Sequence, residues 1–228
     1  MVEVQQKKLK VVVTAGPTRE HLDPVRFLSN PSTGKMGFAV AEAAARRGHE
    51  VVLVAGPVSL KTPKGVRRVD VVSARDMCAA TLAAVREAAG RGEKVVVVAT
   101  AAVADWRPAR CAPKKLKKSQ MADTIRLVRN PDILKTLSRL PAKERPVLVG
   151  FAAETGDAVA EAGRKCREKK LSLIVANDVT APGAGFGVDT NRVAFVFPDG
   201  TAERLPLMTK RAVARRVVAA TESQLLRF

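Results

Sequence analysis

Short apolar runs rich in valine alternate with alanine-rich segments along the sequence, and this alternation limits the possible folds more than any other feature. Residues 9–16 (LKVVVTAG), 50–57 (EVVLVAGP) and 93–102 (EKVVVVATAA) are typical of strands that are buried on both faces of a parallel sheet. Further strands of the same sheet are expected at residues 66–72, 145–154 and 171–178.

Segments with helical composition separate these strands. Residues 38–48 (FAVAEAAARRG) end in an Arg-Arg-Gly sequence that suits a helix C-terminus, and residues 73–92 begin at Ser73, the expected N-cap. Helices are also expected at residues 130–140, 156–170 and 209–226. The alternation predicts an α/β fold with a Rossmann-like, doubly wound and mostly parallel sheet. Since no linker interrupts it, residues 1–228 are expected to form a single domain.

Two stretches break the alternation. Residues 108–123 (PARCAPKKLKKSQMAD) are polar, carry four lysines within five positions and show no apolar period, so a loop is expected there. Residues 192–207 (RVAFVFPDGTAERLPL) alternate around a Pro-Asp-Gly turn and predict a β-hairpin appended after the core sheet. We expect this hairpin to pair with another subunit as a dimerisation arm.

The charge of the chain is strongly positive, with 40 Lys and Arg against 22 Asp and Glu and a formal net charge of +18. Such a charge is compatible with binding nucleic-acid phosphates. However, the aromatic content is 4% and tyrosine is absent, so residues for a base-stacking platform are lacking. Nucleic acid is therefore disfavoured as a partner, whereas a positive field suits an enzyme that handles several phosphates.

The sequence gives no sign of a membrane segment or of an export signal. No apolar run approaches the ~20 residues that cross a bilayer, and residues 1–10 lack the apolar segment of a signal peptide. Three scattered cysteines without a CxxC motif, and two histidines, fit neither a disulfide framework nor a zinc site. The expected location is the cytoplasm.

The segment SNPSTGKMG, residues 29–37, contains a Gly-Lys pair but lacks the Walker A spacing, and no G-x-G-x-x-G fingerprint follows the first strand. The segment precedes a predicted helix, whose free N–H groups and dipole favour an anion. We therefore expect a phosphate site there, although Ser and Thr at such positions are also common N-caps. The expected phosphate-binding residues are Ser32, Thr33, Gly34 and Gly37.

Polar or aromatic residues follow the predicted strands at the edge where α/β sheets bind ligands. Asp105 follows one strand, Asn177 and Asp178 follow another, and Phe151 lies near the end of a third. A carboxylate there suits Mg²⁺ that is shared with phosphate oxygens, so Asp105 is a candidate metal ligand. The lysine-rich loop comes directly after Asp105, which favours a lid over a polyanionic substrate rather than a solvated charge run or a grip on nucleic acid.

Several motifs in order along the chain closely resemble phosphopantothenate–cysteine ligase, the ligase domain of the bifunctional coenzyme A biosynthesis flavoprotein family. The motifs are TAGPTREHLDPVRFLSNPSTGKMGFAVAEAAARRG, ATAAVADWRP, PKKLKK, NPDIL, VGFAAET and IVAND. The resemblance implies that phosphopantothenate and L-cysteine are joined at the expense of a nucleoside triphosphate through an acyl-nucleotidyl intermediate. It also implies CTP rather than ATP as co-substrate, Mg²⁺, a homodimer and possible association with a separate or fused decarboxylase. The flavin of that decarboxylase is not expected in this chain.

The resemblance also assigns roles to individual residues. Asn30 is expected beside the acyl intermediate, Lys115 is expected to be the lid lysine, and the hairpin near Val193 is expected to form the dimer arm. Residues expected to bind the nucleotide are Ala101, Asp105, Lys115, Pro131, Asp132, Ile133, Leu134, Phe151, Lys165 and Lys169. A nucleotide-binding reductase on the same fold and a basic nucleic-acid-binding protein are the alternative functions.

Overall fold

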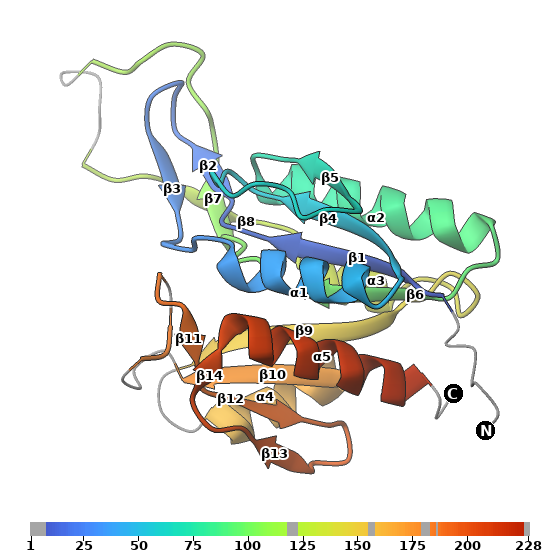
Figure 1. The fold of residues 1–228 in the computed structure, drawn as a ribbon. Coiled ribbons are helices and arrows are strands. Elements are labelled where there is room, and N and C mark those ends of the chain that lie inside the picture. The colour runs from blue at the N-terminus through green and yellow to red at the C-terminus, as the bar shows by residue number, and fades with distance from the viewer. Residues whose placement is uncertain (1–7, 118–122, 155–157, 179–182, 186, 226–228) are drawn as a thin grey trace, which may run out of the picture.

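A central eight-stranded sheet forms the core of the computed structural model, which describes residues 8–117, 123–154, 158–178, 183–185 and 187–225. Its strand order is β13-β12-β10-β9-β6-β1-β4-β5, as Figure 1 shows. Six of its strands are mutually parallel, which confirms the predicted α/β fold. They are β1 (Lys10–Ala15), β4 (Glu50–Ala55), β5 (Val66–Asp70), β6 (Val95–Ala99), β9 (Val147–Glu154) and β10 (Leu173–Asp178).

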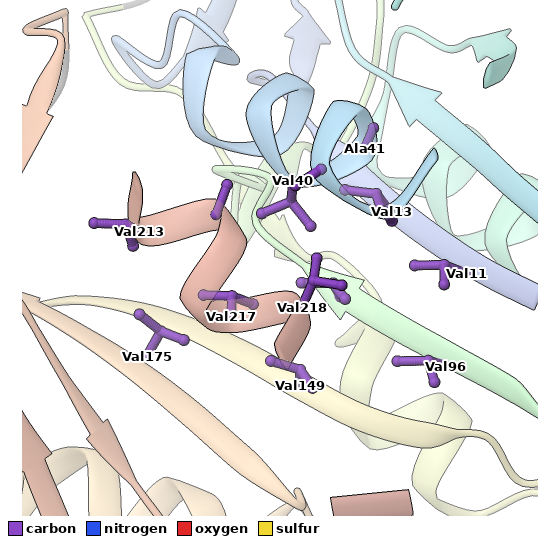
Figure 2. Packing of buried hydrophobic residues seen from close by; sticks show 14 of the residues in the cluster. Val11, Val13, Val40, Ala41, Val96, Val149, Val175, Val213, Val217 and Val218 are labelled. Carbon is purple, nitrogen blue, oxygen red and sulfur yellow. The ribbon is translucent and has the colours of Figure 1, made fainter. Parts of the chain in front are cut away.

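Helices cover both faces of this sheet (Figure 1). On one face, α1 packs against α5 and both lie over the valines of the central strands. In Figure 2, Val40 of α1 and Val217 of α5 point toward Val13 and Val149 of the sheet. Each fully buried valine contributes ~1.5–3 kcal/mol by leaving water. The helices are α1 (Lys35–Arg46), α2 (Ala74–Gly90), α3 (Ile133–Ser138), α4 (Ala158–Glu168) and α5 (Lys210–Leu225).

The predicted N-cap of α2 is confirmed, because the Ser73 hydroxyl accepts a hydrogen bond from the Asp76 amide and the Asp76 carboxylate accepts one from the Ser73 amide. This reciprocal pair satisfies two of the N–H groups that a helix start leaves open. Among the helices that the structure describes, none has both the length and the apolar character needed to cross a bilayer.

The predicted hairpin exists, but its expected place outside the core sheet was wrong. β12 (Val193–Val196) pairs antiparallel with β10, and β13 (Ala202–Arg204) pairs with β12, so the hairpin extends the central sheet. Val193 and Phe195 are buried in the core on the α1–α5 face, whereas Ala194 and Val196 are buried on the opposite face. The alternating pattern therefore belongs to a strand that is covered on both faces.

Three short antiparallel ribbons were not predicted. β2 (Arg19–His21) pairs with β3 (Phe27–Ser29), β7 (Trp106–Pro108) with β8 (Leu127–Arg129), and β11 (Thr190–Asn191) with β14 (Met208–Thr209). In Figure 1 the first two ribbons project beyond the sheet, and the lysine-rich loop runs between β7 and β8. Lys118 of that loop, and Asp178 as a side chain, lie outside what the structure describes.

Candidate functional site

The start of α1 lies at the carboxyl edge of the sheet, where the sequence predicted a phosphate site. Its N-cap is Gly34, in the left-handed conformation with φ 77°, and no side chain caps the helix. The alternative assignment of Ser32 and Thr33 as N-caps is therefore wrong. The left-handed conformation favours glycine, which has no side chain that could cap the helix. The N–H groups of the first turn therefore remain suited to an anion.

Gly37 in the first turn of α1 is required by packing. A Cβ atom at this position would lie 2.5 Å from Ala15 Cβ and 2.4 Å from Thr100 Oγ1. The missing side chain lets the start of α1 approach the ends of β1 and β6 closely. Gly37 therefore sets the position of the start of α1, independently of any contact that it makes with a ligand.

Asn30 connects two sides of the site. Its Nδ2 group donates a hydrogen bond at 3.1 Å to the carbonyl oxygen of Ala102, which lies in the segment that follows β6. This bond joins residues that are 72 positions apart. Because an amide nitrogen has two hydrogens, one remains for a ligand.

Two adjoining cavities open at this edge of the sheet. The first, cavity A, has a volume of about 470 Å³ and is lined by Asn30, Ser32, Thr33, Gly34 and Gly37. The second, cavity B, has a volume of about 660 Å³ and is lined by Ala101, Asp105, Phe151, Lys165, Lys169 and the 131–134 turn. The residues that line both are Ala101, Val103, Asp105, Leu134, Phe151, Lys165 and Lys169. The structure thus brings together every predicted site residue except Lys115.

An ion pair joins the 131–134 turn to Lys169, the residue that follows α4. Asp132 caps α3 by accepting a hydrogen bond from the Lys135 amide at 3.0 Å, and its other oxygen lies 2.8 Å from Lys169 Nζ. Burial works to raise the pKa of Asp132, but the hydrogen bonds from Lys169 and from the Lys135 amide outweigh it and lower the pKa. Lys169 is thus engaged in an ion pair within the protein itself.

Asp105 is the carboxylate that both cavities share. It is exposed, and its backbone oxygen accepts a hydrogen bond from the Asn130 amide at 2.8 Å. Among the described residues, no group of three or more His, Cys, Asp or Glu is arranged to hold a metal. A lone carboxylate suits Mg²⁺, which takes one or two carboxylates and completes its shell with water and phosphate oxygens.

Lys115 lies outside both cavities, on a segment that is docked against the β2–β3 turn. The neighbouring Leu116 amide donates to the Asp23 carboxylate at 3.2 Å, and Arg26 Nη2 donates to the Leu116 carbonyl oxygen at 2.8 Å. Burial works to raise the pKa of the fully buried Asp23. The hydrogen bonds from Arg26 and from the backbone amides of Val25 and Leu116 outweigh it and hold the pKa below its ordinary range.

Sequence reasoning did not assign several residues of the site. Lys210 and Asn191 line cavity A together with Asn177, which had been noted only for its place after a strand. Lys35, Arg19 and Arg26 lie within or close to residues 29–37 in the sequence, where cations suit a phosphate. Lys35 instead forms an ion pair with Asp189 at 2.7 Å, Arg26 pairs with Asp23, and Arg19 lies over the Phe27 ring. No local sequence signal distinguishes these structural cations from cations that bind a ligand.

Comparisons with known proteins agree with this architecture. Residues 6–224 match the family described as DNA/pantothenate metabolism flavoprotein C-terminal domain. The chain is 50% identical over 209 residues to the coenzyme A biosynthesis bifunctional protein CoaBC of Bacillus subtilis (strain 168), covering 91% of this chain and 50% of that protein. It is 48% identical over 212 residues to CoaBC of Escherichia coli (strain K12), covering 92% of this chain and 50% of that protein.

A solved structure shares the fold. The crystal structure of the C-terminal domain of CoaBC is 41% identical in sequence and superposes with a TM-score of 0.79, over 96% of this chain and 97% of that one. The chain spans about half the length of the full-length relatives that it matches. The resemblance inferred from the motifs is confirmed, and the chain belongs to the family of DNA/pantothenate metabolism flavoprotein C-terminal domains.

Proposed function

We propose that the chain is a phosphopantothenate–cysteine ligase of coenzyme A biosynthesis. The observation that supports this most strongly is the joining of two cavities at one sheet edge. Cavity A carries an uncapped helix start suited to phosphate, and cavity B carries a turn, an aromatic ring and two lysines suited to a nucleotide. The coenzyme A biosynthesis proteins to which the chain is similar support the same function.

In the first step, a carboxylate oxygen of phosphopantothenate attacks the α-phosphorus of the nucleoside triphosphate. The bond to the β-phosphate breaks, pyrophosphate leaves, and an acyl-nucleotidyl anhydride remains. Holding both reactants in adjoining cavities replaces a bimolecular encounter by a reaction within one complex. Lys115 is assigned to the departing phosphates, and the segment that carries it is docked on the β2–β3 turn through the Leu116 amide.

In the second step, the amine of cysteine attacks the acyl carbon. The bond to the nucleotide oxygen breaks, the nucleoside monophosphate leaves, and the nitrogen gives up a proton. Negative charge develops on the acyl oxygen in this step, and Asn30 is assigned to donate to it with the amide hydrogen not used by Ala102. The hydrogen bond to Ala102 holds the Asn30 amide group in one orientation before the reaction begins.

Mg²⁺ is assigned to Asp105 together with phosphate oxygens of the nucleotide. An ion held there by Asp105 would supply neutralisation of charge on the phosphates. The place of Asp105 between the two cavities fits this assignment, because the transferred nucleotide must span both. CTP is the proposed nucleotide, and the Ala101 backbone together with the 131–134 turn are assigned to its base and sugar. No flavin is assigned to this chain.

A homodimer is part of the proposal, but the surface that supports it differs from the expected hairpin. Large apolar side chains are exposed on the β2–β3 and β7–β8 ribbons and in the residues next to them. We call these residues the ribbon surface; they are Val25, Phe27, Trp106, Ile125 and Leu127, each 39–55% exposed. Clustered apolar exposure of this kind is typical of an interaction site, and a second copy of the chain is the assigned occupant. A decarboxylase, fused or separate, is the proposed functional partner in the cytoplasm.

The test is a substrate-omission assay on the purified chain. The expected result is that pyrophosphate release requires phosphopantothenate and a nucleoside triphosphate, that amide formation also requires cysteine, and that CTP supports turnover better than ATP. No product with either nucleotide would contradict the function. An Asn30→Asp variant is expected to release pyrophosphate once and accumulate acyl-nucleotide in rapid-quench experiments, whereas Ser29→Ala behaves as wild type. Amide formation by Asn30→Asp at the wild-type rate would refute the role of Asn30.

A further inference from the structure

The part of cavity A next to β10 contains polar groups to which no role is assigned above. The Asn177 Oδ1 atom is buried, and among the described residues no donor lies within hydrogen-bonding distance of it. An unpaired buried carbonyl of this kind costs ~1–3 kcal/mol. Asn177 lines cavity A, so a ligand that enters the cavity can supply the missing donor.

Lys210, the first residue of α5, lines the same cavity and is only 7% exposed. Its ammonium group donates to the carbonyl oxygens of Gly185 at 3.0 Å and Val188 at 2.5 Å. Since an ammonium group has three donors, one remains. Burial is the main cause of the lowered pKa of Lys210, and the nearby charge of Lys35 adds to it.

No carboxylate among the described residues forms an ion pair with Lys210. Asp189, whose backbone oxygen accepts a hydrogen bond from the Lys210 amide at 2.8 Å, places its carboxylate 2.7 Å from Lys35 Nζ. Two ammonium groups, those of Lys35 and Lys210, thus share the single carboxylate of Asp189. A cation that is buried without a counter-ion is costly, and an anion in the cavity would complete the pairing.

The sheet register brings these residues to one place. Asn177 lies opposite Val193 in the antiparallel pair of β10 and β12, and Asn191 precedes Val193 by two residues. Asn191 lies opposite Met208, two residues before Lys210, and its side-chain oxygen accepts from the Gly185 amide at 3.5 Å. The arrangement thus joins strands β10, β11 and β14 and the start of α5.

We propose that Lys210 and Asn177 form a subsite that takes the anionic group of one of the two substrates being joined, with an adjacent N–H or O–H group donating to Asn177. Neither residue lines cavity B, so the subsite is separate from the one assigned to the nucleotide. The proposal rests on the ligase function. Two groups have the required chemistry: the carboxylate of cysteine, beside its amine, and the phosphate of phosphopantothenate, near its hydroxyl.

The experiment measures kcat/KM for each substrate with Lys210→Met, which removes the charge at similar length, and Asn177→Ala. Arg211→Met is the matched control, because Arg211 is the next residue of α5 but lines neither cavity A nor cavity B. Cysteine is compared with cysteamine, which lacks the carboxylate, and phosphopantothenate is compared with pantothenate, which lacks the phosphate. Loss of one charged hydrogen bond predicts a reduction of about ten- to hundredfold for the substrate that carries the anion.

If the cysteine carboxylate occupies the subsite, Lys210→Met lowers kcat/KM for cysteine but not for cysteamine, and pyrophosphate release in the first turnover is unchanged. If the phosphate occupies it, the preference for phosphopantothenate over pantothenate falls instead. Asn177→Ala is expected to affect the same substrate. Equal losses for all substrates, a loss confined to CTP, or losses that Arg211→Met reproduces would overturn the proposal. Absence of any amide product with the wild type would instead refute the ligase function.

Discussion

The Leu116 backbone amide donates a hydrogen bond to the buried Asp23 carboxylate at 3.2 Å, which links residues that are 93 positions apart. The same carboxylate holds the turn between β2 and β3 by accepting from the Val25 and Arg26 amides. Asp23 therefore sets both the shape of this turn and the place of the segment that carries Lys115. The position of Lys115 thus depends on a residue that lines neither cavity.

Asp23→Asn is expected to destabilise the fold and to release the segment around Leu116. Because the pKa of Asp23 is lowered in the folded state, its contribution is present above the unfolded pKa of about 3.9 and is lost as pH falls toward the lower folded value. The difference in unfolding free energy between wild type and variant should thus shrink on acidification below about pH 4. Urea titrations across this range provide the measurement, with exposed Asp70→Asn as control. A difference that is independent of pH would contradict the account.

Lys115→Gln is expected to reduce turnover far more than Lys114→Gln. Both side chains are exposed in the structure, so their difference arises only when substrate is bound. A charge-assisted hydrogen bond to phosphate contributes ~1.5–3 kcal/mol, whereas a solvated surface charge contributes ~0–1 kcal/mol. Steady-state rates at saturating CTP compare the two variants. Equal losses of turnover in the two variants would contradict a specific role for Lys115 and would indicate that both lysines contribute only a general positive field.

Gly37→Ala is expected to destabilise the protein by ~1–3 kcal/mol, because the added methyl group overlaps Ala15 and Thr100. It should also move the start of α1 and weaken phosphopantothenate binding. Gly90→Ala is a control with the opposite sign: it lies in α2, and no atom stands within 4 Å of its added methyl group. This second change should stabilise by ~0.5–1 kcal/mol. Thermal unfolding of both variants measures the contrast, and a Gly37→Ala variant as stable as wild type would be incompatible with the packing described.

The ribbon surface predicts a dimer that is weakened by Trp106→Ser combined with Leu127→Ser. Both side chains are more than one-third exposed, so the substitutions should leave the subunit folded. Exposed residues on β13, such as Glu203, serve as controls on the hairpin that the sequence had favoured. Light scattering at micromolar concentration should give a dimer mass for wild type and Glu203→Ala and a lower mass for the double variant. A monomeric wild type would refute the dimer itself.

The elements predicted correctly are those whose residues carry a pattern of their own. The valine runs of β1 and β6 and the alanine-rich α1 are long enough to show their period. Ribbons such as β7 and β8, with three residues in each strand, are too short for one. The hairpin of β12 and β13 was found from its turn, but only tertiary packing determines that both faces of β12 are covered.

The same distinction applies to the site. Asp105 was singled out because it follows a strand end, and the carboxyl edge of a parallel sheet gathers such residues. Lys210 begins a helix near the end of the chain and reaches cavity A only through the pairing of β11 with β14. The contact between Asp23 and Leu116 likewise depends on how two loops dock, for which neither segment carries a local pattern.

The central claim, an acyl-nucleotidyl intermediate formed in adjoining cavities, is tested most directly by oxygen transfer. Phosphopantothenate labelled with oxygen-18 in its carboxylate is turned over with CTP and cysteine, and the nucleotide product is analysed by mass spectrometry. The proposed chemistry predicts one labelled oxygen in CMP, because the carboxylate oxygen that attacks the α-phosphorus leaves with the nucleotide. Unlabelled CMP, or label in inorganic phosphate with release of CDP, would contradict it.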